Sequence, residues 1–162
     1  MAHPLGWDPT NDTSPGVPTI LRLRMRGGSK PLAERLRRAA DRMLDSLELA
    51  DAELSVLLVS DPAIRVLNRV HRGQDRPTDV LSFALGETPG PGTPRLLGDV
   101  VISLPTAARQ AKSRSRALFP EARFLLAHGL LHLLGYDHAT KRQKRRMDAA
   151  ARRLVRAAKG PR

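Results

Sequence analysis

The sequence predicts a single α+β domain in which a small mixed β-sheet is flanked by helices. Its 162 residues are enough for one hydrophobic core and too few for two well-developed ones. Short runs rich in branched apolar residues alternate with longer segments whose apolar residues recur at helical spacing. This order favours one compact α+β domain, which we expect to span residues 19–162.

The first half of the chain is predicted to contain a tail, two strands and two helices. Residues 1–18 are rich in Pro, Gly, Asp and Thr and lack apolar periodicity, so we expect a flexible tail. Residues 19–26 alternate Leu or Met with Arg, which predicts a half-buried strand at a sheet edge. An amphipathic helix follows and extends to about Ala50. The apolar run 53–60 predicts an interior strand, and Asp61–Pro62 then opens a second helix.

The remaining elements follow from turn residues and periodicity. Residues 80–85 and 98–104 are strand candidates, separated by a Gly- and Pro-rich stretch, 86–97, that we expect to be a loop. Two helices are expected to start near Pro105 and Pro120. The last helix is predicted over about residues 141–158, with Thr140 and Gln143 as its capping box. Its apolar stripe is Met147, Ala150, Ala151, Leu154 and Ala158.

The charge of the chain is strongly positive and unevenly distributed. Lys and Arg number 28 against 16 Asp and Glu, a net charge of +12. Residues 141–162 hold ten of the basic residues and one Asp, and so contribute +9 of that total. A charge of this size favours polyanionic partners. The alternative is a merely solvated basic helix face.

The absence of cysteine excludes disulfides and thiolate metal ligands, which fits a reducing compartment. The N-terminus has neither the basic nor the apolar region of a secretory signal, and no apolar run approaches the length of a membrane span. We therefore expect a soluble, cytoplasmic protein.

The segment HGLLHLLGYDH, residues 128–138, contains three of the five histidines. His128 and His132 are four residues apart, so on a helix they share one face with Cβ atoms about 5–6 Å apart. Gly135 can take the positive φ that ends a helix and so bring His138 back toward them. This pattern predicts a metal site rather than three packed or surface imidazoles.

Three imidazoles leave a fourth coordination position open, which is typical of catalytic Zn²⁺; we expect one ion per chain. Zinc lowers the pKa of a bound water to about 7. Asp137 is either a second-layer acceptor for a ligand imidazole or an ordinary turn residue. Metzincin proteases share the histidine spacing, but Gly129 stands where they carry the Glu that acts as general base, which argues against peptide hydrolysis.

An arginine-rich segment, residues 67–83, is the second candidate site. Arg69, Arg72 and Arg76 lie in or beside its loop, and guanidinium groups bind phosphate through paired donors. The loop is therefore a candidate clamp for a nucleic-acid backbone, although a solvated loop has the same composition.

The segments HGLLHLLGYDH, NRVHRGQDRPTDVLSF and LLGDVVIS together closely resemble the YbeY family of bacterial endoribonucleases, in the same order, from about residue 53 to residue 138. The resemblance implies an α+β fold and a metal-dependent, single-strand-specific endoribonuclease that acts in ribosomal RNA maturation, at the 3′ end of the small-subunit 16S rRNA, and in ribosome quality control. Its partners would be ribosomal RNA, ribosomal particles and assembly proteins. It implies zinc ligation by His128, His132 and His138, with Arg72 and His128 in catalysis.

Two departures from the family pattern concern the periphery of the site. The family usually continues with acidic residues after the last histidine, whereas this chain continues with ATKRQKRR, and Ala84 stands where Pro is usual. We expect Arg145, Arg146, Arg152 and Arg153 of the basic terminal helix to contact RNA phosphates. The competing hypotheses are a non-catalytic RNA-binding or ribosome-assembly factor stabilised by zinc and, less favoured, a metalloprotease.

Overall fold

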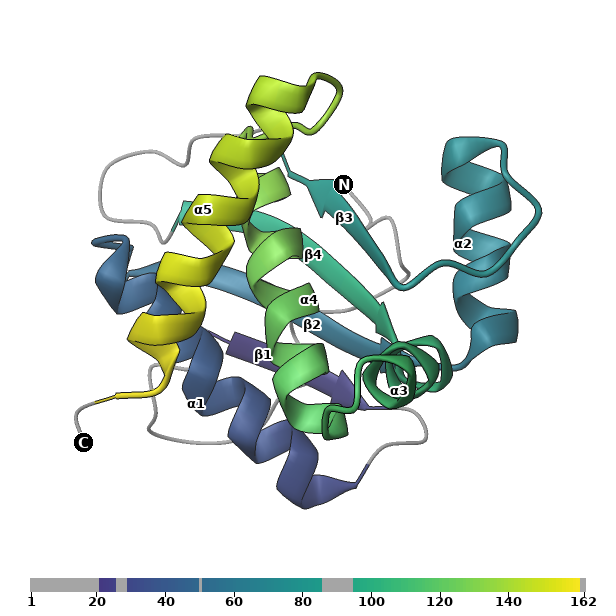
Figure 1. The fold of residues 1–162 in the computed structure, drawn as a ribbon, viewed down its shortest axis with the longest axis horizontal. Helices are drawn as coiled ribbons and strands as arrows, with labels where there is room; N and C mark the ends of the chain where they lie inside the picture. Colours follow the sequence, from purple (N-terminus) through teal and green to yellow (C-terminus); the bar gives the residue numbers. More distant parts are fainter. Residues whose placement is uncertain (1–20, 26–28, 50, 86–94, 161–162) are drawn as a thin grey trace.

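The computed structural model describes residues 21–25, 29–49, 51–85 and 95–160. Within these residues the chain forms four strands and five helices (Figure 1). In chain order they are β1 (Leu21–Met25), α1 (Lys30–Ser46), β2 (Ala52–Val59), α2 (Asp61–Arg72), β3 (Val80–Ala84), β4 (Arg95–Ser103), α3 (Leu104–Ser113), α4 (Leu118–Leu133) and α5 (Lys141–Ala158). The predicted α+β fold is confirmed.

The sheet is mixed and has the strand order β1-β2-β4-β3. β1 and β4 pair with β2 in parallel, while β3 pairs with β4 in the antiparallel direction. The two central strands, β2 and β4, are more deeply buried than the edge strand β3, because a strand paired on both sides and covered on both faces has little contact with water.

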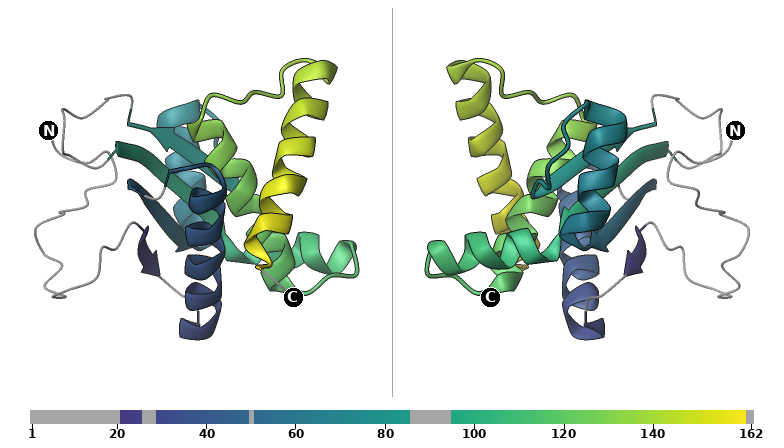
Figure 2. Two further views of the ribbon diagram at one scale, coloured as in Figure 1. Left: turned by 90° about the vertical axis from the view of Figure 1, so that its left-hand side faces the viewer. Right: turned by 90° about the vertical axis from the view of Figure 1, so that its right-hand side faces the viewer.

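Helices cover both faces of the sheet (Figure 2). α1, α4 and α5 pack on one face over the main core, which includes Val56 and Val100. α2 covers the other face through a smaller cluster in which Ile64 meets Val101. Consecutive residues Val100 and Val101 thus serve opposite faces, as the alternation of side chains along a strand requires.

The terminal helix agrees with its prediction in both bounds and orientation. α5 spans Lys141–Ala158, and Thr140 and Gln143 form the expected capping box. All five residues of the predicted apolar stripe are buried. The stripe faces α1 and α4, so the basic residues between its members are left on the surface.

Other predictions needed adjustment. The stretch 86–97 was expected to be a loop throughout, but β4 already begins at Arg95, because Arg95 and Leu96 pair with Ala52 and Glu53 of β2. The expected first helix ends at Ser46, short of Ala50. The predicted tail, residues 1–18, lies outside the described residues. Among the described helices, none is long and apolar enough to cross a lipid bilayer.

Candidate metal centre

The two histidines of α4 lie on its partly exposed side, opposite the side that is tightly packed. α4 is apolar along most of its length, and Leu126, Leu130 and Leu131 are fully buried against the sheet and neighbouring helices. His128 and His132 stand on the side that is only partly covered, and their ring centroids are 4.9 Å apart. The four-residue spacing therefore places the pair on one face, as predicted.

The turn after α4 brings the third histidine to this pair. Gly135 has a φ of +92°, a conformation that L-residues rarely adopt. The backbone N–H of Tyr136 donates to the carbonyl of Leu131 at 3.0 Å and closes the turn. The His138 ring centroid consequently lies 4.9 Å from that of His132 and 5.9 Å from that of His128.

One nitrogen from each of the three imidazoles lies within 4.8 Å of the others, an arrangement that could hold a metal ion. Burial, and to a lesser extent the neighbouring imidazoles, lowers the pKa of His128 and His132. Both rings therefore favour the neutral form, which carries the lone pair that a metal needs. Nδ1 of His128 is buried and has no hydrogen-bond partner among the described residues. The residues present thus fit a metal ion.

His132 and Asp137 are held by the backbone of the turn. His132 hydrogen bonds to the backbone of Tyr136, which opposes the lowering of its pKa. The Asp137 carboxylate accepts a hydrogen bond from the backbone N–H of His138 at 2.7 Å. A hydrogen bond of this kind is the one expected of an ordinary turn residue, and it positions His138 through the backbone.

Gly129 faces the sheet. A Cβ atom at this position would lie 2.6 Å from a methyl carbon of Val100, and the Gly129 carbonyl accepts a hydrogen bond from the Ser82 hydroxyl at 2.8 Å. A glutamate here would collide with β4 before it reached the histidines. The metzincin arrangement is therefore sterically excluded, and α4 lies close to the sheet because position 129 is glycine.

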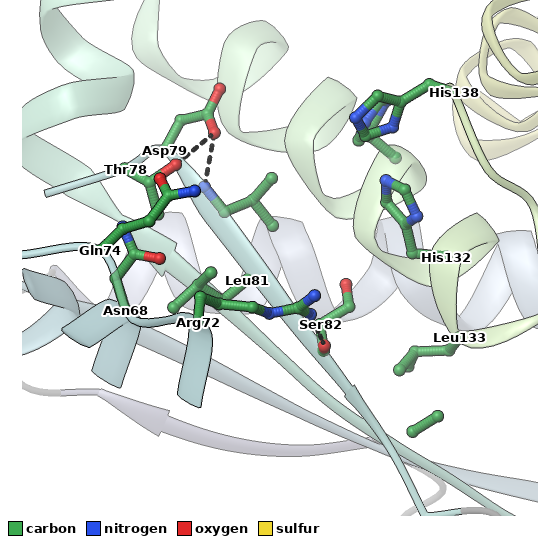
Figure 3. A pocket seen from close by; sticks show the side chains of 13 residues that line it. Asn68, Arg72, Gln74, Thr78, Asp79, Leu81, Ser82, His132, Leu133 and His138 are labelled. Carbon is green, nitrogen blue, oxygen red and sulfur yellow. Dashed lines mark hydrogen bonds between the residues drawn. The ribbon is translucent and has the colours of Figure 1, made fainter. Parts of the chain in front are cut away.

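Arg72 shares a pocket of about 620 Å³ with the three histidines. It is the last residue of α2, and its guanidinium donates to the carbonyl of Ser82 at 2.9 Å. In Figure 3, Arg72 reaches toward Ser82 from one side, while His132 and His138 stand next to each other on the other. The guanidinium has five N–H donors, so most remain available to a ligand.

Sequence reasoning missed several polar residues of this pocket. Asn68 is buried and donates to the carbonyl of Arg76 at 2.9 Å, which holds the loop after α2 in place. Asp79 accepts from the backbone N–H of Val80 at 2.7 Å and from Gln110 at 3.1 Å. The sequence feature that could have indicated them was the cluster of amide and carboxylate residues in the arginine-rich segment, residues 67–83.

The other predicted arginines are not gathered around the histidines. Arg69 lines a separate hollow on the outer side of α2. Arg76 does not line the pocket, but it donates twice, at 3.1 and 2.9 Å, to the side-chain oxygen of Gln74, which does. Arg152 lines a third hollow, between α4 and α5. Arg145, Arg146 and Arg153 are exposed on α5 outside these three hollows.

Comparison with known proteins identifies relatives over most of the chain. A sequence model described as Endoribonuclease YbeY matches residues 26–159. The chain is 57% identical over 125 residues to the Endoribonuclease YbeY of Anaeromyxobacter sp. (strain Fw109-5), covering 77% of this chain and 64% of the relative. Identity to the Myxococcus xanthus Endoribonuclease YbeY is 52% over 130 residues, covering 80% of this chain and 44% of the relative.

The chain thus spans less than two thirds of the length of these two relatives. Coverage is more even for the Endoribonuclease YbeY of Moorella thermoacetica, which is 48% identical over 68% of this chain and 78% of its own length. The solution structure of TM1509 from Thermotoga maritima superposes with a TM-score of 0.64 and 30% identity, covering 86% of this chain and 89% of that protein. On the extent of these matches, the chain belongs to the Endoribonuclease YbeY family.

Proposed function

We propose that the protein is a zinc-dependent endoribonuclease that cuts single-stranded RNA during ribosomal RNA maturation and quality control, with the 3′ end of the small-subunit RNA as its substrate region. The observation that supports this proposal is the pocket in which three imidazoles converge within 4.8 Å and Arg72 lines the same space. Family membership supports the class of reaction. The domain that carries it is residues 19–162, preceded by the tail 1–18.

The ligands of the ion would be His128, His132 and His138. Imidazole suits zinc as well as several other transition metals, and the chain has no cysteine that would offer a thiolate. When bound, one zinc ion per chain would supply a Lewis acid and lower the pKa of a coordinated water or ribose hydroxyl. His128 would take part in catalysis as one of these ligands.

Arg72 would bind the scissile phosphate. Its hydrogen bond to the Ser82 carbonyl fixes the guanidinium against β3 before substrate arrives, so little side-chain entropy is lost on binding. A preorganised cation near the phosphate stabilises the charge that develops on the phosphate oxygens. Arg69, Arg76 and the exposed arginines of α5 would contribute a weaker, longer-range attraction for the RNA backbone.

Cleavage of a ribosomal RNA fragment that contains the small-subunit 3′ end tests the proposal. Wild type, His132→Ala, Arg72→Ala and Arg38→Ala should be purified in parallel, because a contaminating nuclease would give a false activity. Arg38 is an exposed arginine on α1, outside the pocket. We expect His132→Ala and Arg72→Ala each to lower the cleavage rate by about 10²-fold or more, and Arg38→Ala to cut like wild type.

Equal cleavage by all four proteins would assign the activity to contamination and refute the proposal. RNA binding that survives chelation, without cleavage under any metal condition, would instead favour the non-catalytic RNA-binding alternative. The product ends identify the nucleophile: a 2′,3′-cyclic phosphate would show attack by the ribose hydroxyl, whereas a 5′-phosphate with a 3′-hydroxyl would show attack by water.

A further inference from the structure

A second hollow, here called the α4–α5 groove, adjoins the metal centre. It has a volume of about 850 Å³ and is lined by the segment between α3 and α4, by the first half of α4 and by one face of α5. Its lining is strongly basic. Five of its cations have no acidic partner among the described residues: Arg116, Arg123, Arg152, Arg156 and Lys159.

The acidic residues near the groove are already paired. Asp148 is the one carboxylate in the lining, and it accepts from Lys144 at 2.7 Å. Arg114 pairs with Glu121, which is fully buried beneath it. The positive charge of the other cations is therefore left uncompensated within the described residues, and like charges held around one hollow favour an anionic ligand.

Arg123 shows most clearly that the groove lacks a counter-charge. Its Nε is buried and has no hydrogen-bond partner among the described residues. Burial, with a smaller contribution from Arg35, lowers the pKa of Arg123. The described ring contact of its guanidinium is to Phe119, 5.2 Å away, and Arg35 lies over the same ring at 3.8 Å. A partly desolvated guanidinium without an acid is stabilised when an anion enters beside it.

The groove and the metal pocket adjoin at His128, which lines both. Phe124, one turn before His128 on α4, also lines the groove, with its ring centroid 6.2 Å from that of His128. An aromatic ring among cations is the combination that holds single-stranded nucleic acid, because phosphates meet the charges and a base stacks on the ring. A duplex keeps its bases stacked within and cannot offer one.

We propose that the α4–α5 groove binds the phosphodiester backbone of a single RNA strand on one side of the scissile phosphate, with a base stacked on Phe124. The strand would then continue past His128 into the pocket that holds Arg72. This inference rests on the proposed function, since it assigns a path to that substrate. It makes a sharper claim than general attraction by α5, because only the cations of the groove should contribute strongly.

Two charge-reversal pairs on α5 separate these alternatives. Arg152→Glu/Arg156→Glu changes two exposed groove residues, whereas Arg142→Glu/Arg153→Glu changes two exposed residues of the same helix outside the groove. Both pairs alter the net charge equally. The readout is fluorescence anisotropy with an unstructured 2′-O-methyl RNA strand of about 12 nucleotides, titrated at several salt concentrations. Thermal unfolding checks the fold, and Arg→Gln pairs replace any variant that does not fold.

We expect the groove pair to weaken binding by about tenfold or more, and to reduce the slope of log affinity against log salt by about 1 or more, because two phosphate contacts are lost. The control pair should weaken binding by less than about threefold. Equal losses of RNA affinity from both pairs, or no loss from the groove pair, would refute the proposal that the groove binds the RNA strand. Failure of wild type to cut RNA would refute the nuclease but leave this binding result standing, so the two failures are distinguishable.

Discussion

At the scale of single residues, Gly129 decides how closely α4 approaches the sheet. Its missing side chain lets Val100 and the Ser82 hydroxyl contact the helix backbone. Both contacts lie next to His128. Gly129, which leaves no room for the glutamate of a metzincin protease, therefore also sets the distance between β4 and the candidate metal ligands of α4.

We predict that Gly129→Ala lowers the free energy of unfolding by about 1–3 kcal/mol, because the new methyl group would overlap Val100. The measurement is urea unfolding. At an uncrowded helix position the same change would stabilise the protein by up to about 1 kcal/mol, so a gain in stability would contradict the prediction. In Val100→Ala/Gly129→Ala the loss should be smaller than the sum of the two single losses, since the overlap is then relieved.

At the scale of elements, α2 is held in place at its first residue and carries the candidate site residue Arg72 at its last. The Asp61 carboxylate accepts from the Ser103 and Thr106 hydroxyls, each at 2.6 Å, and from Arg109 at 2.8 Å. These contacts join the start of α2 to α3. Because α2 is one continuous helix, these hydrogen bonds at its first residue help to set the position of Arg72 at its last residue.

The hydrogen bonds of the Asp61 carboxylate should make the stability of the protein depend on pH. The hydrogen bond from Ser103, followed by those from Thr106 and Arg109, lowers the pKa of Asp61 from 3.8 to about 2. A carboxylate with a lowered pKa stabilises the fold fully above its unfolded value, and the contribution is lost as the pH falls through the folded value. We predict that Asp61→Asn costs about 1–2 kcal/mol of unfolding free energy at neutral pH.

The difference between wild type and Asp61→Asn should shrink as the pH falls from 3.8 toward about 2. Denaturant unfolding over that range measures it. Asp75→Asn is the matched control, because Asp75 forms an exposed pair with Arg65 at 2.9 Å that contributes little. A difference between wild type and Asp61→Asn that stays constant with pH would show that the carboxylate charge is not what joins the helices.

At the scale of the whole molecule, the three-histidine cluster spans the connection between the core and the C-terminal helix. His128 and His132 belong to α4, whereas His138 lies in the connection that leads to α5. A metal ion held by both segments would bind the folded chain and not the unfolded one, so it would add to stability by mass action. α5 in turn forms one wall of the α4–α5 groove.

We predict that adding Zn²⁺ to chelated protein raises the Tm by several degrees at neutral pH. The pKa values of His128 and His132 lie below the ordinary value of 6.5. Protons therefore compete weakly, and the gain in Tm should persist at pH 6.5 and be lost only at lower pH. His138→Ala should abolish the gain. A Tm unaffected by zinc at neutral pH would argue against a metal at this site.

The sequence by itself determined the features that depend on local spacing. The bounds of α5 followed from its capping box and apolar stripe, and the convergence of three histidines followed from the four-residue spacing and the turn at Gly135. Each of these involves residues within about five helical turns of one another, where helix geometry fixes relative positions.

Only the tertiary structure decided which features face one another. Arg69 and Arg72 are both arginines of α2. The packing of α2 on the sheet places Arg69 at an outer hollow and Arg72 in the pocket of the histidines. The α4–α5 groove joins Arg123 to Arg152, residues far apart in the chain. Helical periodicity predicts which face of a helix is buried. It does not predict what the rest of the helix lies against, because that is set by contacts between distant segments.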